Sequence, residues 1–330
     1  MLAIRCDSWG NAANLRWAEL PDPSAPGPQQ VKIKVAAAGV NFADTLIIAG
    51  QYQVKPNLPF APGFELAGTV LEVGSAVTHV KQGDRVMALV DHGAFAELAL
   101  ADADSVFPLP AGMDFVTGAG FPIAYGTSYG AYAWKARLQA GELLLVHGAA
   151  GGVGLTAVEI GKALGATVIA TAGGSEKLAI ARQHGADYLI DYKEEDIRER
   201  VKEIAASLGR TGVDVVYDPV GGACFEASLR CVAWGARILV VGFASGQVPQ
   251  IPANILLVKN VDALGFFFGS YRQQRPDLVQ QAFADLGRMF EQGALKPHVS
   301  HQLPAESIAE AFDLLASRRS TGKVVLILPQ

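Results

Sequence analysis

The sequence predicts an α/β protein in which a doubly wound parallel sheet of the Rossmann type is inserted into a second, mainly β domain. Two observations predict it: the middle of the chain alternates β-rich runs with helix-period segments, and both flanks hold short runs bounded by Gly and Pro. The 330 residues are enough for two domains, and half of them are hydrophobic. We place the Rossmann domain at 124–266 and the flanking domain at 1–123 together with 267–330.

Six β-rich runs define the central sheet, and helical segments fit between them. Val153, Ala157, Ile160 and Leu164 recur at helical spacing after the first run, and Gly165 is suited to end that helix. Such alternation is typical of parallel βαβ units. The expected strands are Leu143–His147, Thr167–Thr171, Tyr188–Ile190, Val213–Tyr217, Arg237–Val241 and Val261–Leu264.

The flanks predict a compact, mainly antiparallel β domain. Helices are expected over about 277–292 and 306–317, followed by a strong strand at Lys323–Leu328. A single final strand needs a sheet to join, so we expect the chain to leave the first domain, build the Rossmann domain and return. The expected N-terminal strands are Val31–Ala37, Leu66–Val73, Arg85–Leu89 and Phe95–Leu100.

A glycine-rich turn follows the first strand of the central sheet. Gly151 and Gly154 keep the spacing of a dinucleotide-binding turn, although Ala149 replaces its first glycine. The N–H groups and dipole of the next helix suit a pyrophosphate. The alternative is a merely structural turn, but the strand before it and the helix after it favour dinucleotide binding. The residues expected to contact the cofactor here are Ala150, Gly151, Gly152 and Val153.

The end of the second strand indicates NADPH rather than NADH. NAD enzymes place an acid there for the ribose 2′-hydroxyl, whereas this chain has Thr171-Ala-Gly-Gly-Ser-Glu-Lys177. Ser175 and Lys177 offer donors to a 2′-phosphate, and Gly173 is expected to contact the cofactor beside them. With Ser175 as N-cap, Glu176 falls in the first helical turn, where the helix dipole accounts for a carboxylate. The alternative for Lys177 is a solvated helix residue.

Charge and cysteine content exclude several classes of partner. The net charge is −5 with Lys and Arg scattered, so we expect no nucleic acid and no membrane as partner. The segment from Met1 to Arg16 lacks the apolar stretch of a signal peptide, so we expect a cytoplasmic location. Three cysteines are too few for a disulfide framework.

The histidines and cysteines predict no metal site. The six histidines are dispersed, and no Cys pair has the short spacing of a structural zinc site. His298 and His301 could come together locally, but three residues apart in an extended chain they face opposite sides. Without a Lewis-acid metal, plain alcohol oxidation is disfavoured, and acceptors that take a hydride readily are favoured.

Six motifs carry a resemblance that covers essentially the whole chain. With them the sequence resembles the quinone oxidoreductase (zeta-crystallin-like) branch of the zinc-independent medium-chain dehydrogenase/reductase superfamily, which implies a GroES-like catalytic domain around the Rossmann domain. Zinc-dependent relatives have Cys near Asn41 and Gly-His-Glu where this chain has Gly63-Phe64-Glu65, and Phe64 cannot ligate a metal. The motifs are Ala38-Gly-Val-Asn-Phe-Ala-Asp-Thr45, Pro62-Gly-Phe-Glu-Leu-Ala-Gly68, Gly83-Asp-Arg-Val86, Ala124-Tyr-Gly-Thr-Ser128, His147 to Gly154 and Tyr217-Asp-Pro-Val-Gly-Gly222.

The resemblance also implies a catalytic pocket around the nicotinamide and the substrate, formed by Asn41, Asp44, Tyr52 and Thr127. Asn41 and Tyr52 can donate hydrogen bonds to a carbonyl oxygen as hydride arrives, where negative charge develops. Asp44 can orient its neighbours, and Thr127 can hold the nicotinamide ribose or carboxamide. The alternative for Asn41 is a helix cap, since Asn-x-x-Asp precedes an apolar run. The alternative for Thr127 is a helix N-terminus.

Further positions match the family's cofactor groove. Tyr192 and Arg318 match positions near the 2′-phosphate, with a surface residue as the alternative for each. Val220, Gly242, Phe243 and Phe267 match positions after the later strands, where ligands sit in open α/β sheets. The three phenylalanines at 266–268 could instead be core or subunit-interface aromatics. A Rossmann edge strand in this superfamily often pairs across a dimer, so a homodimer is expected.

The sequence therefore predicts an oxidoreductase that transfers a hydride from NADPH to a small quinone or α,β-unsaturated carbonyl compound. One rival is an enoyl-thioester reductase of the same superfamily, which needs a basic rim for the coenzyme A phosphates. Another is an NADPH-binding protein with a non-catalytic main role, such as a lens-type structural protein or an RNA-binding protein. No basic cluster supports either rival.

Overall fold

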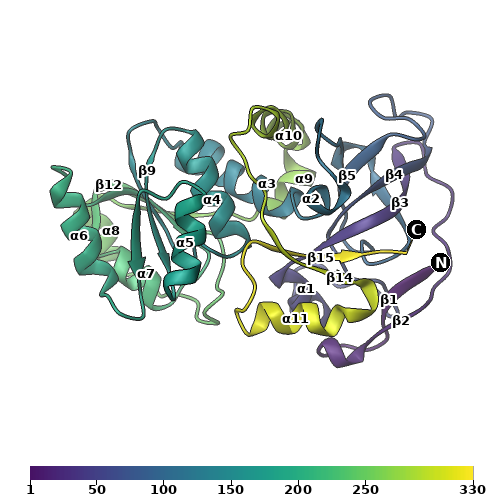
Figure 1. The fold of residues 1–330 in the computed structure, drawn as a ribbon, viewed down its shortest axis with the longest axis horizontal. Coiled ribbons are helices and arrows are strands. Elements are labelled where there is room, and N and C mark those ends of the chain that lie inside the picture. The colour runs from purple at the N-terminus through teal and green to yellow at the C-terminus, as the bar shows by residue number, and fades with distance from the viewer. Residues whose placement is uncertain (330) are drawn as a thin grey trace. The chain divides into compact units, whose positions relative to one another are not determined.

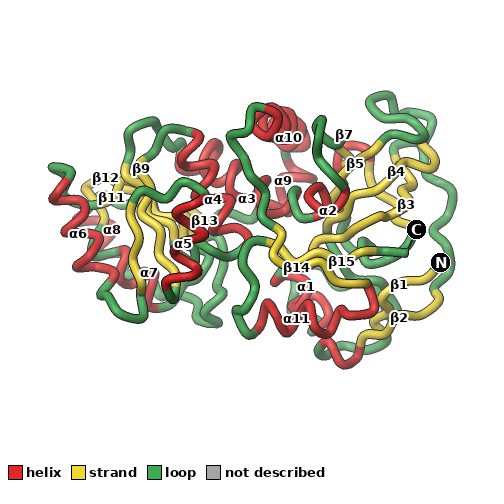
Figure 2. Tube along the Cα trace, viewed as in Figure 1, coloured by secondary structure: helices red, strands yellow, loops and turns green. Residues whose placement is uncertain are grey.

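The computed structural model describes residues 1–329 and divides into two compact units (Figures 1 and 2). The β unit comprises Met1–Ala124, Tyr271–Glu291 and 297–329. The Rossmann unit comprises Tyr125–Ser270 and Gln292–Lys296. The chain therefore leaves the β unit, builds the Rossmann unit and returns, as the final strand of the sequence predicts.

The Rossmann unit is built on a six-stranded parallel sheet in the order β10-β9-β8-β11-β12-β13. The order reverses at β8, which pairs with both β9 and β11, and such a reversal opens a ligand crevice at the carboxyl ends of the strands. Side chains on these strands are fully buried, among them Leu145, Ile169 and Val216. The strands are β8 (Leu143–Val146), β9 (Thr167–Ala172), β10 (Tyr188–Asp191), β11 (Val213–Asp218), β12 (Val232–Val240) and β13 (Asp262–Gly265).

Helices follow the strands of this sheet, as the alternating pattern predicts. They are α4 (Gly152–Ala163), α5 (Ser175–Gln183), α6 (Ile197–Ser207), α7 (Ala223–Ser228), α8 (Ala253–Lys259) and α9 (Phe268–Gln274). Helix α3 (Pro122–Gly130) precedes the first strand and continues into a π-helical turn at Ala131–Ala136. Strand β12 begins five residues before the predicted Arg237, at Val232. Gly235, with φ 75°, and exposed Trp234 interrupt the apolar pattern there and hide that part of the strand in the sequence.

The β unit contains a seven-stranded sheet whose main path runs β14-β15-β3-β4-β5-β7, with β6 paired to β3. All its pairs are antiparallel except β14 with β15. The C-terminal β15 lies beside β3, so the yellow and purple ends of the chain meet in one sheet (Figure 1). The strands are β3 (Gln30–Val40), β4 (Glu65–Val73), β5 (Arg85–Leu89), β6 (Leu98–Asp102), β7 (Val106–Pro108), β14 (Val299–Pro304) and β15 (Lys323–Ile327).

Shorter elements complete this unit. A two-stranded antiparallel sheet pairs β1 (Leu2–Cys6) with β2 (Leu15–Glu19). The helices are α1 (Phe42–Ile48), α2 (Phe115–Ala119), α10 (Pro276–Glu291) and α11 (Ile308–Ala316), with 3-10 turns at Ala12–Asn14, Ala103–Ser105 and Ala305–Ser307. The strand predicted from Phe95 begins at Leu98 instead, because Phe95 bonds through its N–H to Pro62 and through its carbonyl to Ile4. None of the helices in residues 1–329 combines the length and the apolar character needed to span a bilayer.

Candidate functional site

The glycine-rich turn lies between β8 and α4, at the carboxyl edge of the parallel sheet. Helix α4 starts at Gly152, with Gly151 as its N-cap, and a helix start leaves backbone N–H groups without intrahelical partners. A Cβ atom on Gly154 would stand 2.1 Å from the carbonyl oxygen of Gly148, so only glycine fits at 154. Gly151 has room for a Cβ, which would meet the same oxygen at 3.4 Å. The turn thus keeps a tight backbone and a helix N-terminus suited to an anion.

A buried histidine, His147, directly precedes this turn and is bonded on both sides of its ring. His147 is fully buried; its Nδ1 lies 3.0 Å from Thr171 Oγ1, and its Nε2 lies 2.8 Å from Ser228 Oγ. Burial lowers the pKa of His147, so the ring is neutral and links β8, β9 and α7 by hydrogen bonds. The sequence predicts a strand that ends at His147. It does not predict the partners of the ring, because Thr171 and Ser228 lie in distant segments of the chain.

The turn after β11 is ordered by a carboxylate. Asp218 is buried, and its Oδ1 accepts hydrogen bonds from Val220 N at 2.8 Å and Gly221 N at 2.9 Å. Its Oδ2 is buried with no hydrogen-bond partner, which leaves an acceptor for a donor on a bound molecule. Val220 lies beside the phosphate turn, since a Cβ on Gly148 would stand 3.2 Å from Val220 Cγ2. Asp218 is a candidate cofactor residue that the sequence reasoning missed.

The region predicted for the 2′-phosphate lies at the ends of β9 and β10. No acid ends β9, and α5 holds Ser175, Glu176 and half-buried Lys177 in its first turn. A Cβ on Gly173 would stand 2.8 Å from Tyr192 Oη, so these two predicted residues lie together. The structure thus brings four predicted cofactor residues of the Rossmann unit to one edge: Gly173, Ser175, Lys177 and Tyr192.

Two details of this edge differ from the sequence reasoning. Ser175 was expected as the N-cap, but Gly174 holds that position because its φ of 96° turns the chain into the helix one residue earlier. Asp191, at the end of β10, accepts the N–H of Gly174 at 3.1 Å on each carboxylate oxygen and that of Lys193 at 3.0 Å. No local pattern predicts this contact, because Asp191 belongs to the next strand.

The remaining groove residues of the Rossmann unit follow β12 and β13. A Cβ on Gly242 would stand 3.3 Å from the carbonyl oxygen of Pro219, and Phe243 is 39% exposed. Phe267 is 45% exposed, whereas Phe266 and Phe268 are buried. The alternative of a core aromatic therefore holds for the two flanking phenylalanines and not for Phe267. Arg318 belongs to the β unit, where it follows α11 with a left-handed φ of 56°.

Thr127 lies in the middle of α3 and is buried, so the alternative of a helix N-terminus is wrong for it. The proline at 122 starts this helix five residues earlier than Thr127, since proline fits the first helical position. Its neighbour Ser128 lies 2.8 Å from Thr156 Oγ1 and 3.0 Å from Tyr217 Oη. These contacts fix α3 against α4 and β11.

In the β unit, Asn41 and Asp44 lie together at the start of α1. Asn41 is the N-cap, and its backbone N–H donates to Asp44 Oδ2 at 2.7 Å. Its side-chain amide instead faces two charged residues: Nδ2 donates to Glu65 Oε1 at 2.8 Å, and Oδ1 accepts from Lys323 Nζ at 2.6 Å. Asn41 therefore caps α1 through its backbone, while its side chain bonds to Glu65 and Lys323. The sequence reasoning gave no role to Glu65 or Lys323.

Burial dominates the titration of the two acidic groups at this site. Asp44 is fully buried, and burial raises its pKa to about 8 against the opposing effects of the Asn41 N–H and the Lys323 charge. Burial likewise raises the pKa of Tyr52 to about 12. The Tyr52 and Phe64 ring centroids are 5.1 Å apart. Near neutral pH, Asp44 and Tyr52 are both protonated and can act as hydrogen-bond donors.

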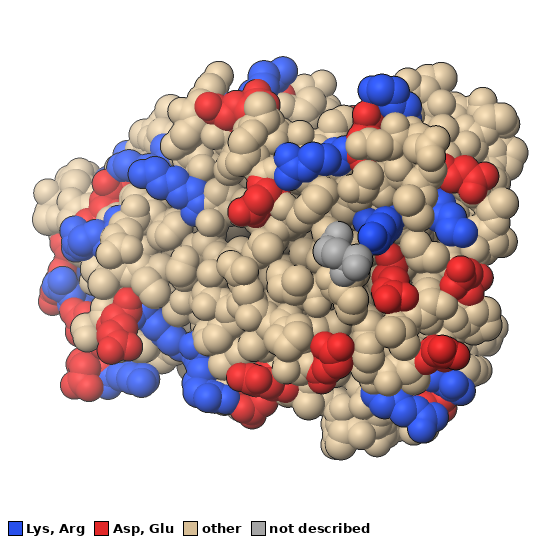
Figure 3. Space-filling view, turned by 45° about the vertical axis from the view of Figure 1, so that its right-hand side comes forward, with Lys and Arg blue, Asp and Glu red and all other residues tan. Residues whose placement is uncertain are grey.

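Other features of the β unit bear on ligands. Within residues 1–329, no group of three or more His, Cys, Asp and Glu side chains is placed to hold a metal ion. A cavity of about 450 Å³ is lined by Phe60, Ala61, His92 and neighbouring residues, and none of the predicted site residues lines it. Lys, Arg, Asp and Glu side chains are interspersed on the face shown in Figure 3.

Comparisons with known proteins place the chain in a family. Residues 27–111 match the alcohol dehydrogenase GroES-like domain, and residues 152–284 match the zinc-binding dehydrogenase domain. A quinone oxidoreductase-like protein 2 homolog from Nematostella vectensis is 42% identical over 303 residues, which are 91% of this chain and 82% of that protein. Quinone oxidoreductase from Homo sapiens is 35% identical over 331 residues, covering 99% of this chain and 98% of that protein.

Solved structures agree with these relatives. Escherichia coli quinone oxidoreductase complexed with NADPH is 33% identical, with a TM-score of 0.90 over 99% of this chain and 100% of that chain. A mycobacterial protein complexed with NADPH is 32% identical, with a TM-score of 0.91 over the same shares of the two chains. The whole length of the fold is thus shared, as are both domain types. This chain belongs to the quinone oxidoreductase branch of the medium-chain dehydrogenase/reductase superfamily.

Proposed function

We propose that this protein uses NADPH to reduce a small quinone or α,β-unsaturated carbonyl compound, and that it does so without a metal ion. The observation that carries the proposal is the phosphate turn at the start of α4, where a Cβ on Gly154 would stand 2.1 Å from Gly148 O. The turn follows β8, an inner strand of a six-stranded parallel sheet, and the chain resembles proteins solved with NADPH.

The residues of the Rossmann unit fit NADPH. The first turn of α4, with Ala150, Gly151, Gly152 and Val153, offers N–H groups to the pyrophosphate. The unpartnered Oδ2 of Asp218 can accept a ribose hydroxyl. The edge formed by Gly173, Ser175, Lys177 and Tyr192 carries a cation and two hydroxyls and no acid at the end of β9, which suits a 2′-phosphate. We assign Val220, Gly242, Phe243, Phe267 and Arg318 to the same cofactor, as the family positions imply.

Bound NADPH supplies a hydride from nicotinamide C4, and the protein supplies positioning and electrostatics. A quinone that accepts this hydride also takes up one proton and becomes a hydroquinone. Tyr52 and the Asn41 amide can donate hydrogen bonds to the carbonyl oxygen where negative charge develops. Asp44 is protonated near neutral pH, since burial raises its pKa to about 8, and it holds the backbone of Asn41. Thr127 is assigned to the nicotinamide ribose or carboxamide.

Stopped-flow oxidation of NADPH by ortho- and para-quinones tests the function, with an enone and crotonyl-coenzyme A as further acceptors. We expect turnover with a quinone or the enone. Selective turnover of crotonyl-coenzyme A would instead support an enoyl-thioester reductase. If every acceptor fails while NADPH still binds, the protein is a cofactor-binding protein and the proposal is wrong.

Metal analysis tests the zinc-free mechanism. Phe64 stands beside Glu65 where zinc-dependent relatives have a histidine, and a phenyl ring offers no ligand atom. We expect full quinone reduction from protein that contains no stoichiometric zinc. Zinc at one ion per chain, with activity lost on chelation, would refute this part of the proposal.

We also propose a homodimer formed through the β13 edge of the Rossmann sheet. β13 pairs with β12 and lies at the end of the strand order. Trp234 on β12 and Leu257 and Val258 on α8 are 76%, 78% and 76% exposed, an unusual exposure for large apolar side chains. Sedimentation velocity should give a dimer that dissociates in the Leu257→Glu/Val258→Glu variant. A monomeric unmodified protein would rule the dimer out.

A cytoplasmic location is the remaining part of the proposal. All three cysteines are free thiols, which suits a reducing compartment. Fractionation of the source cells with an antibody against the protein tests it. We expect the protein in the cytosolic fraction, and recovery from an oxidising compartment would contradict the assignment.

A further inference from the structure

Three segments that are far apart in the sequence meet at one end of the β-unit sheet. Strand β3 lies between β15 and β4, with Val40 opposite Val324 and Gly39 opposite Glu65. Asn41 therefore follows the end of β3 at the level where Lys323 begins β15 and Glu65 begins β4. The strand register alone brings one cation, one anion and one amide to the same place.

The cation and the anion form a buried ion pair. Lys323 Nζ lies 2.8 Å from Glu65 Oε1, and the two side chains are 8% and 0% exposed. A Cβ on Gly39 would stand 2.4 Å from Glu65 Oε1, so the absence of a side chain at 39 makes room for the carboxylate. Buried ion pairs contribute little net stability compared with apolar side chains of similar volume, because both charges lose their hydration. Stability alone does not account for this pair.

The pair is completed by Asn41. The three N–H groups of the Lys323 ammonium have three acceptors: Val40 O at 3.0 Å, Asn41 Oδ1 at 2.6 Å and Glu65 Oε1 at 2.8 Å. Glu65 Oε1 accepts from Asn41 Nδ2 at 2.8 Å, and Glu65 Oε2 accepts from Ile123 N at 2.7 Å. Lys323 and Glu65 therefore each have one bond to the Asn41 amide, one bond to each other and one to a backbone group, Val40 O or Ile123 N.

This arrangement permits one orientation of the amide. If the amide turned over, its NH2 group would face the ammonium and its oxygen would face the carboxylate, so donor would meet donor and acceptor would meet acceptor. The ammonium on Oδ1 also draws electron density from the amide, which strengthens both N–H groups of Nδ2 as donors. One of them is bound to Glu65, and the other has only a long contact of 3.4 Å to Gly39 O.

We propose that Glu65 and Lys323 are positioning residues of the reductase, which hold and polarise the Asn41 amide so that its second N–H is available to a substrate carbonyl oxygen. The proposal rests on the function proposed above. It assigns the ion pair a role in the chemical step, through Asn41, in addition to its place in the sheet.

A double-mutant cycle on kcat for quinone reduction tests this role. The cycle compares Lys323→Met and Glu65→Gln in the unmodified background and in the Asn41→Ala background. We expect each single variant to lower kcat roughly 10- to 100-fold, with little change in the Kd of NADPH, because a misplaced group slows the chemical step by such factors. In the Asn41→Ala background, the same exchanges should leave kcat within about twofold, since the amide they position is absent.

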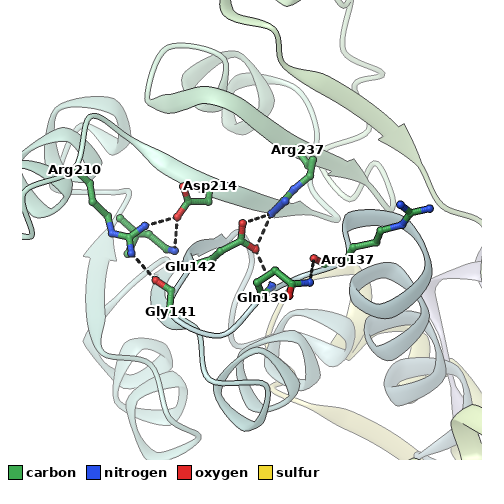
Figure 4. Close-up of polar contacts among 8 residues, drawn as sticks. Arg137, Gln139, Gly141, Glu142, Arg210, Asp214 and Arg237 are labelled. Carbon is green, nitrogen blue, oxygen red and sulfur yellow. Dashed lines mark hydrogen bonds and ion pairs between the residues drawn. The ribbon is translucent and has the colours of Figure 1, made fainter.

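The Glu65→Gln/Lys323→Met variant guards against loss of folding, because it removes both charges together and leaves neither buried alone. It should melt cooperatively and have the kcat of Asn41→Ala. A matched control exists in the Rossmann unit, where Arg237 Nη2 lies 2.6 Å and 2.7 Å from the two oxygens of Glu142 (Figure 4). Arg237→Met and Glu142→Gln break a partly buried pair and should leave kcat unchanged.

The outcomes separate the inference from the proposed function. If Lys323→Met and Glu65→Gln lower kcat by the same factor with and without Asn41, the positioning role is wrong. It is also wrong if the Glu65→Gln/Lys323→Met variant folds and keeps the kcat of the unmodified protein. An unmodified protein that turns over no quinone or enone would overturn the proposed function and the inference with it. Turnover that is indifferent to Asn41→Ala would overturn the inference alone.

Discussion

Gly154 and Gly148 approach so closely that a Cβ on the first would stand 2.1 Å from the carbonyl oxygen of the second. No flexible side chain can move aside there, because the contact is with backbone. The Gly154→Ala exchange must therefore shift the phosphate turn. We expect NADPH affinity to fall at least about tenfold, which is about 1.4 kcal/mol, as measured by cofactor fluorescence.

Gly151→Ala is the comparison for that variant. Its Cβ would meet Gly148 O at 3.4 Å, an ordinary contact, so the fold tolerates the methyl group. The free energy of unfolding should stay within about 0.5 kcal/mol of the unmodified protein, whereas NADPH binding weakens because the methyl group occupies the space of the pyrophosphate. Unchanged NADPH affinity in Gly151→Ala would show that the phosphates lie elsewhere.

Lys177→Ala should distinguish the two nicotinamide cofactors. Lys177 lies in the first turn of α5, which begins two residues after Gly173, and Gly173 in turn lies against Tyr192. A charge-assisted hydrogen bond to the 2′-phosphate is worth about 1.5–3 kcal/mol, so the Kd of NADPH should rise while that of NADH stays the same. Arg182→Ala, in the last turn of the same helix, removes an exposed cation and should change neither. Equal losses for both cofactors would refute the assignment.

Asp218→Asn should weaken NADPH binding without unfolding the turn. The asparagine oxygen can still accept the N–H groups of Val220 and Gly221, while an NH2 group replaces the unpartnered Oδ2. If Oδ2 accepts a ribose hydroxyl, the loss of this acceptor should cost about 1–3 kcal/mol of NADPH affinity in calorimetric titration. A variant that binds NADPH normally and is more stable than the unmodified protein would exclude Asp218 from the cofactor site.

Asp44 should make stability depend on pH. Burial raises its folded pKa to about 8 from the ordinary value of 3.8, so between these pH values the folded protein binds a proton that the unfolded chain has lost. Stability from Asp44 is therefore fully present below about pH 4 and is lost as pH rises through about 8, by at most about 1.4 kcal/mol per pH unit. Urea unfolding at several pH values should show that the free energy of unfolding of Asp44→Asn rises relative to that of the unmodified protein as pH rises. Parallel pH profiles would contradict this.

The sequence predicts the Rossmann unit well because its signals are local. The turn from His147 to Gly154 follows a buried strand and precedes a helix, and each of these lies within a short window. The ion pair of Glu65 and Lys323 has no such signal, since Lys323 is 282 residues from Asn41 and meets it only through strand register. Gly174 as the cap of α5 escaped prediction for a related reason, because Asp191 on another strand completes that turn.

The pairing of β15 with β3 also determines the order in which the molecule can be completed during synthesis. The residues of the Rossmann sheet leave the ribosome before Lys323, so that sheet can close while the β unit still lacks a strand. Until β15 emerges, the Ala37–Val40 part of one edge of β3 lacks its partner, while Gln30–Lys34 on that strand already pairs with β6. An unpaired stretch of this kind can recruit a foreign strand. A nascent chain stalled before β15 therefore presents an open strand edge that the completed protein covers.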